Sequence, residues 1–232
     1  APARDPFGAR AVIFALLIAA TDSETDRQLE IVRSSTDATC HRMTANLVPQ
    51  MGTLGPAARL PVLDIALPAL RQLSPSQAND FRKVLAALIQ ADQKVTLFEY
   101  CMFKIVSEAI RAAEHAPGGG QINYLSLNPL LPDIATILAA LAETGGDENA
   151  YDAGMSRLGA PETAERPAPG LDLRRLEQAL SRLDQSSPAI KRRLIDAAAH
   201  TVAADGVVRE EEAELLRAIC ATLGVPMPLL TQ

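Results

Sequence analysis

Apolar residues recur along most of this chain with the three- and four-residue spacing that places them on one face of an α-helix. Two leucine stripes show the pattern most clearly: Leu60, Leu63, Leu67 and Leu70, and Leu173, Leu176, Leu180 and Leu183. Proline, glycine and short polar clusters interrupt the periodicity at intervals, as they do between helices. The pattern predicts an all-α fold.

One turn occurs twice in the chain. Ala204–Glu212 is an acidic turn between two apolar-periodic segments, and Ala91–Glu99 has the same Ala-Asp-x-x-Val-x-x-x-Glu spacing at an offset of 113 residues (205 − 92 = 113). The leucine stripes recur at this offset, and so does Ser74-Pro75, which Ser187-Pro188 matches. Because the register holds without a gap from residue 60 to residue 106, we interpret the repetition as an internal duplication.

An apolar helix and a shorter helix precede each repeat. These pairs are predicted at 9–20 with 24–34, and at 133–142 with 148–158. Two pseudo-symmetric halves of about five helices each follow, with an additional helix at 36–48 in the first half. We place the first half at 1–114, a linker at 115–131 and the second half at 132–232, with repeat cores at about 60–112 and 173–225.

Local signals predict several helix ends. Ser23 is placed to cap the helix at 24–34, and Thr96 with Glu99 forms a Thr-x-x-Glu capping box. Pro49 and the cluster of Gly52, Gly55 and Pro56 are expected to end the additional helix. Pro68 lies inside a leucine stripe and predicts a kink or a late break there.

Composition and net charge mainly exclude classes of structure and partner. Hydrophobic residues make up 48% of the chain and aromatic residues only 3%, with no Trp, so the core must be aliphatic, which favours packed helices. A net charge of −6 is poorly suited to binding phosphate backbones, so we expect no nucleic-acid partner. The most apolar run, residues 11–20, is too short for a membrane span of about 20 residues, so we expect no span in this chain.

No catalytic constellation is present. The chain has no Gly-x-Ser-x-Gly, phosphate-binding loop or dinucleotide fingerprint. Its histidines stand apart, and its cysteines are expected to be buried free thiols: His41, His115 and His200, and Cys40, Cys101 and Cys220. We predict that the chain is not an enzyme, has no catalytic residues and requires no cofactor.

The repeated acidic turn admits two interpretations. In the favoured one, Asp205 accepts backbone N–H groups of the turn while Glu210–Glu212 complement the dipole of the following helix. In the other, Asp205 and Glu212 converge on a hard divalent cation such as calcium or magnesium. Asp92 and Glu99 form the corresponding pair in the first copy, where an intruding lysine makes the turn less suited to a metal.

Residues 203–219 resemble a known module. Ala-Ala-Asp-Gly-Val-Val, followed by Glu-Ala-Glu-Leu-Leu-Arg-Ala-Ile, is similar to the core helix-turn-helix of tellurite-resistance TerB-like domains. The resemblance implies a small all-α module whose matching acidic residues are linked to divalent cations. Asp205 and Glu212 carry over to this chain, with Asp92 and Glu99 as a second pair, so a divalent cation is the one cofactor that the resemblance implies.

A wider set of motifs spans nearly the whole chain: Asp5–Val12, Arg59–Asp64, Ala69–Pro75, Leu97–Tyr100 and Leu223–Pro228. Together they resemble the cytoplasmic C-terminal region of bacterial membrane-anchored zinc metallopeptidases of the HtpX-like, CAAX-endopeptidase-related family. In that family the zinc-binding HExxH helix and the transmembrane helices precede this region, and neither is in this chain. The first residue is Ala1 rather than Met, which agrees with a piece cut downstream of them.

These resemblances lead to a functional expectation. The chain would be the non-catalytic, soluble C-terminal domain of a membrane zinc metallopeptidase, cytoplasmic and tethered to the inner membrane through a missing N-terminal region. Its role would be regulatory, or recognition of a substrate or partner, and it would bind another protein or the remainder of the same peptidase. The alternative is a free-standing TerB-like protein for divalent-metal binding or stress response that uses Asp205 and Glu212 directly.

Overall fold

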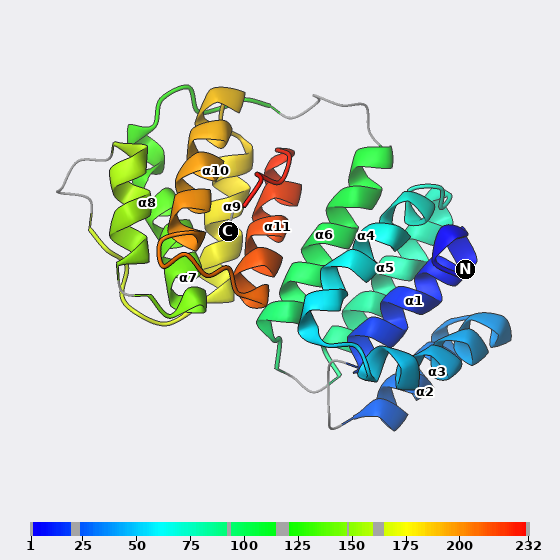
Figure 1. Cartoon of the computed structure of the whole chain (residues 1–232). Coiled ribbons are helices and arrows are strands. Elements are labelled where there is room, and N and C mark those ends of the chain that lie inside the picture. The colour runs from blue at the N-terminus through cyan, green and yellow to red at the C-terminus, as the bar shows by residue number, and fades with distance from the viewer. Residues whose placement is uncertain are drawn as a thin grey trace. The chain divides into compact units, whose positions relative to one another are not determined.

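The computed structural model describes residues 2–19, 24–91, 94–114, 121–147, 149–159 and 165–230. Within these ranges the chain forms eleven α-helices and three short 3-10 helices, with a single isolated bridge between Tyr124 and Ser186 in place of any strand. The predicted all-α class is confirmed. The chain divides into two compact units, Ala1–Pro117 and Gly118–Gln232, and each is described by itself (Figure 1).

The first unit is built around α1 (Pro6–Ala19). Every residue from 11 to 18 is at most 2% exposed, because a helix that is apolar all round must lie inside the core. The helices in contact with α1 are η1 (Pro2–Arg4), α2 (Thr25–Ser35), α3 (Ala38–Gly52), α4 (Arg59–Leu70) and α5 (Pro75–Ile89). α6 (Leu97–Glu114) packs on α4 and α5, and η2 (Pro56–Ala58) leads into α4.

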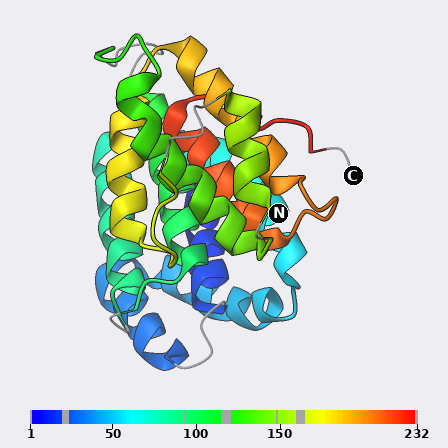
Figure 2. The same ribbon diagram turned by 90° about the vertical axis from the view of Figure 1, so that its left-hand side faces the viewer.

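The second unit is built around α7 (Leu131–Gly145), which follows η3 (Asn128–Leu130). Four helices contact α7: α8 (Ala150–Leu158), α9 (Leu173–Asp184), α10 (Pro188–Val202) and α11 (Glu210–Leu223). α7 runs between α8 and α9 (Figure 2). Its apolar residues are buried against these neighbours, as those of α1 are in the first unit.

Helix bounds in the two units follow the offset of 113 found in the sequence. α5 and α10 begin at Pro75 and Pro188, and α6 and α11 begin at Leu97 and Glu210. The same helix pairs are in contact: α4 with α6 as α9 with α11, and α5 with α6 as α10 with α11. α3 is the additional helix of the first unit. These correspondences agree with an internal duplication, which stays a prediction.

Several helix ends differ from their predicted positions. α1 begins at Pro6 because the Asp5 carboxylate caps it, accepting the N–H groups of Phe7 at 3.0 Å and Gly8 at 2.9 Å. α3 continues through Pro49, which was predicted to end it, and ends at Gly52, the first glycine of the predicted cluster. An interior proline removes one backbone hydrogen bond and crowds the carbonyl four residues earlier, and α3 ends within three residues of it.

Other helix signals have mixed outcomes. α4 ends at Leu70, two residues after Pro68, which fits the predicted late break. Ser23 lies outside the described residues, and Glu24 stands at the N-cap of α2 without a capping hydrogen bond from its side chain. α8 begins at Ala150. No helix in the described ranges combines the length and the apolar content that crossing a bilayer requires.

The later part of the predicted linker packs onto the second unit. The N–H groups of Asn123 and Tyr124 donate to the carbonyl of Gln185 at 2.8 and 3.2 Å, and the N–H of Ser187 donates to the carbonyl of Tyr124 at 2.9 Å. Leu130 is fully buried. Residues 121–130 therefore hold the turn between α9 and α10, while the unit boundary after residue 117 falls inside the predicted linker.

Candidate functional site

The acidic turn of the second unit joins α10 to α11. Asp205 Oδ1 accepts the N–H of Val207 at 2.9 Å, the hydrogen bond that the structural interpretation of the sequence predicts. Gly206 has a φ of +76°, a left-handed conformation that residues with a Cβ rarely adopt. The turn is therefore fixed by its own backbone and by Asp205.

Arg209 brings the two predicted cation ligands together. Its Nη1 lies 2.9 Å from Asp205 Oδ2 and 3.7 Å from Glu212 Oε2. Its backbone N–H donates to the same Glu212 Oε2 at 2.9 Å, which is half of a capping box at the start of α11. Asp205 and Glu212 thus do converge, and the group that they share is a guanidinium.

The surroundings of the two carboxylates differ. The Asp205 side chain is partly exposed, and the N–H of Val207, followed by Arg209, holds its pKa below the usual value. The Glu212 side chain is only 3% exposed, and burial raises its pKa against the opposing hydrogen bond and charge of Arg209. Its Oε1 lies against Gly145 at the end of α7, where a Cβ would collide with it. Glu212 therefore joins the start of α11 to the end of α7.

The corresponding turn of the first unit uses a hydroxyl. The N–H and Oγ1 of Thr96 donate to Glu99 Oε2 at 2.8 and 2.9 Å, and the N–H of Glu99 donates to Thr96 Oγ1 at 3.2 Å. This confirms the predicted capping box. Thr96 stands 113 residues before Arg209, so the same position carries a neutral side chain in one unit and a cation in the other. Asp92 lies outside the described residues.

Other reactive side chains form no candidate centre in the described ranges, where no three His, Cys, Asp or Glu residues lie close enough to hold a metal ion. Cys40, Cys101 and Cys220 are buried free thiols, as predicted. Burial raises the pKa of Cys220 to about 12, so this thiol stays protonated at neutral pH. His200 is exposed, with its Nδ1 at 2.9 Å from the carbonyl of Asp196.

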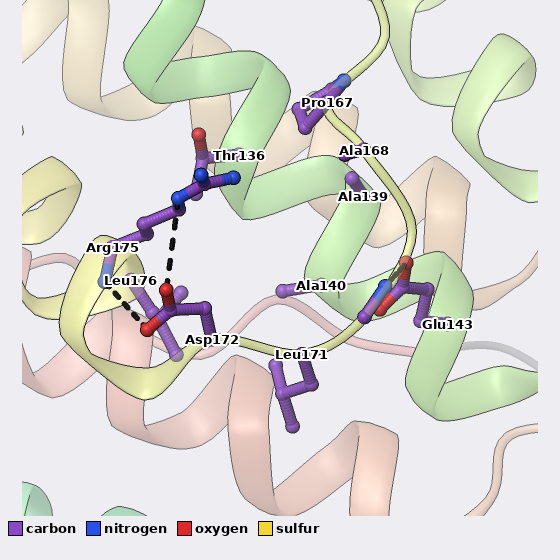
Figure 3. A pocket seen from close by; sticks show the side chains of 11 residues that line it. Thr136, Ala139, Ala140, Glu143, Pro167, Ala168, Leu171, Asp172, Arg175 and Leu176 are labelled. Atoms are coloured by element: carbon purple, nitrogen blue, oxygen red, sulfur yellow. Dashed lines mark hydrogen bonds and ion pairs between the residues drawn. The ribbon is translucent and has the colours of Figure 1, made fainter.

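Two surface hollows are small. The first, of about 30 Å³, lies where the extended chain at Pro167 and Ala168 passes over α7 (Figure 3). Glu143 Oε1 accepts the N–H of Gly170 at 2.7 Å and fixes this extended segment to α7. The second, of about 270 Å³, lies between the first turns of α1 and α3, with Phe7, Arg10, Asp37, Thr39, Cys40 and Met43 around it. Both are smaller than the ~300–1,000 Å³ of typical small-molecule sites.

The outward face of α4 has an apolar stripe. Pro61, Ile65 and Pro68 are all exposed, and Ile65 is 53% exposed. The equivalent positions of α9, 113 residues later, are also exposed and polar: Arg174, Gln178 and Ser181. Our interpretation of the sequence used only the inward leucines of these helices and missed this face. A comparison of the outward positions of the two copies would have found it.

Comparison with known families identifies one part of the chain. Residues 170–228 match the family described as tellurite resistance protein TerB. The match covers α9, α10, α11 and the acidic turn with Asp205 and Glu212, so the chain carries a TerB domain at these residues. No curated protein and no solved structure matched the chain.

Proposed function

We propose that the chain is a non-catalytic helical module that recognises a protein partner through the outward face of α4. The observation that carries the proposal is the exposed stripe of Pro61, Ile65 and Pro68. These residues recur at intervals of four and three, which places them on one side of the helix, opposite its buried leucines.

The fold does not require this stripe. α4 and α9 bury the same inward pattern, with Leu63, Leu67 and Leu70 matching Leu176, Leu180 and Leu183. Only their outward faces differ, because α9 places arginine, glutamine and serine where α4 places proline and isoleucine. An exposed isoleucine contributes little to folding, and Pro68, inside the helix, costs a backbone hydrogen bond. A partner that covers the face gives these residues a role.

The chemistry of the face favours a protein as the partner. The outer face of a helix has no concavity to enclose a small ligand, whereas the buried centres of protein interfaces are apolar and depleted of charge. One exposed residue of each sign, Asp64 and Arg71, borders the stripe, so it lacks the excess of positive charge that a nucleic acid or an anionic membrane would need. The occupant that fits is the apolar face of another polypeptide.

We further propose that this partner belongs to a membrane-anchored zinc metallopeptidase of the HtpX-like family, with this chain as its C-terminal regulatory region. The support is the set of sequence motifs at 5–12, 59–64, 69–75, 97–100 and 223–228. The upstream reading frame tests this context directly. An open frame that runs through transmembrane helices and HExxH into this chain supports it, and a start codon just before Ala1 contradicts it.

Photo-crosslinking tests the recognition surface. A photoreactive amino acid at position 65, compared with the same group at position 178 of α9, should give a discrete adduct only at position 65. Mass spectrometry of the adduct identifies the partner. Ile65→Gln, which copies the α9 residue, should weaken binding of the purified partner about tenfold or more while leaving the circular dichroism spectrum unchanged.

The outcomes separate the two proposals. No adduct at position 65, equal labelling at both positions, or an adduct between two copies of this chain contradicts recognition of a partner through α4. An adduct with a protein that lacks HExxH supports recognition and contradicts the peptidase context. The alternative function is binding of a divalent metal at Asp205 and Glu212. The Arg209 guanidinium, which contacts both carboxylates, disfavours it.

A further inference from the structure

The place where Asp205 and Glu212 converge already holds a positive charge. Arg209 Nη1 is 2.9 Å from Asp205 Oδ2 and 3.7 Å from Glu212 Oε2, so both carboxylates face the same nitrogen. A guanidinium is charged at every pH at which proteins fold. A divalent ion between these carboxylates would lie against this charge.

Three of the four carboxylate oxygens accept hydrogen bonds from N–H groups. Asp205 Oδ1 accepts the N–H of Val207, Asp205 Oδ2 accepts Arg209 Nη1, and Glu212 Oε2 accepts the N–H of Arg209. The fourth, Glu212 Oε1, packs on Gly145. Calcium needs six to eight oxygen ligands. The residues of this turn therefore do not fit a divalent cation while Arg209 keeps its place.

The position of Arg209 needs an explanation of its own. It is the N-cap residue of α11, where the partial positive charge of the helix dipole disfavours a cation. The contacts with Asp205 and Glu212 offset this cost. Residues 210–212, three glutamates in the first turn, complement the same dipole. Arg209 is therefore placed where the carboxylates around it, Asp205 first, make a cation favourable.

The first unit shows that the capping box does not itself need a cation. There, Thr96 closes the box on Glu99 with its hydroxyl and its N–H, at 2.9 and 2.8 Å. The Arg209 side chain is an addition to this shared arrangement, and its distinctive contact is the ion pair with Asp205.

We infer that the Arg209 guanidinium takes the place of a divalent cation in the TerB turn of this chain. The ion pairs of Arg209 with Asp205 and Glu212 close the turn, so its geometry is independent of calcium, magnesium or zinc. This differs from the cation link that the TerB resemblance implies. The inference concerns α11 and does not depend on what binds α4.

Calorimetry on the full chain tests the inference. Calcium, magnesium and zinc chlorides are titrated separately into the wild type, Arg209→Thr and Arg209→Lys. Arg209→Thr copies the first unit and removes the guanidinium from both carboxylates, whereas Arg209→Lys keeps a positive charge and serves as the matched control. We expect no saturable heat from the wild type or Arg209→Lys up to about 10 mM, above the ~1 mM of the weakest calcium modules.

Arg209→Thr should bind at least one of these cations with a Kd of about 1 mM or tighter. Adding Asp205→Asn should abolish that binding. Saturable binding by the wild type that Asp205→Asn removes would overturn the inference, and so would a folded Arg209→Thr that binds none of the three ions. If circular dichroism shows that Arg209→Thr is unfolded, Arg209→Gln replaces it and decides by the same criteria.

Discussion

Glu212 shows how one buried carboxylate can link two distant helices. Its Oε2 accepts the N–H of Arg209 at the start of α11, and its Oε1 rests on Gly145 at the end of α7. The carboxylate needs the space that the missing Cβ of Gly145 provides. Gly145 is helical and does not have a positive φ, so its role here is close approach rather than backbone freedom.

Gly145→Ala should therefore destabilise the protein by about 1–3 kcal/mol, because the new methyl group displaces the Glu212 carboxylate from its capping position. Gly52→Ala is the matched control, since a Cβ at Gly52, near the end of α3, meets nothing within 4 Å. It should be neutral or slightly stabilising. Urea denaturation measures both variants, and equal stabilities would contradict the role given to Gly145.

Contacts of single residues could be predicted from the sequence where they are local. Thr96 and Glu99 are three residues apart, so their capping box is visible as a motif. Arg209 pairs with Asp205 four residues away, but a guanidinium that replaces a cation has no sequence motif. The contact of Gly145 with Glu212 joins two helices far apart in the sequence, and only the packing of α7 on α11 creates it.

α3 shows how one side chain fixes the start of a helix. Asp37 Oδ1 accepts the N–H groups of Thr39 at 3.0 Å and Cys40 at 2.9 Å, and Oδ2 lies 3.7 Å from Arg10. The hydrogen bond from Cys40, with smaller contributions from Thr39 and Arg10, holds the pKa of Asp37 below its usual 3.8. The folded state therefore favours the ionised carboxylate.

Asp37→Asn keeps an acceptor for these N–H groups and removes the charge. Because the pKa of Asp37 is lowered on folding, its charge stabilises the protein fully above pH 3.8, and this stability is lost as the pH falls through the lowered value. The side chain is 56% exposed, so we expect only a few tenths of a kcal/mol.

The free energy of unfolding in urea, measured from pH 3 to pH 7, tests this expectation. Wild type should exceed Asp37→Asn by a constant amount near neutrality, and the two should approach each other toward pH 3. Asp37→Ala, which also loses the acceptor, should cost about 1 kcal/mol at pH 7. A gap between wild type and Asp37→Asn that widens as the pH falls would contradict the assignment.

At the scale of whole helices, the buried faces are those that the sequence predicts. The leucine stripes of α4 and α9 are buried as their spacing predicts. Their ends are less predictable, because Pro49 stays within α3 and Asp5 starts α1 early. The start of α1 depends on the hydrogen bonds that Asp5 accepts, which apolar periodicity does not reveal.

On the scale of the whole molecule, the matched TerB segment and the compact unit have different limits. Residues 170–228 contain α9, α10 and α11, but the unit runs from 118 to 232 and centres on α7. Periodicity marks α7 as a helix without a polar face. It does not say which helices cover α7, so the limits of the unit emerged only from the packing.

A fragment of residues 170–228 should therefore not fold cooperatively, whereas 118–232 and 1–117 should. Without α7, the fully buried residues Leu176, Leu180 and Leu183 of α9 lose a large part of the surface they pack against. Few apolar contacts then remain to offset the conformational entropy of ordering the short fragment. Circular dichroism during urea titration should show a single transition for each unit and a gradual, low-amplitude change for 170–228. A sharp transition in 170–228 alone would show that its three helices form a core without α7, and the central position given to α7 would then be wrong.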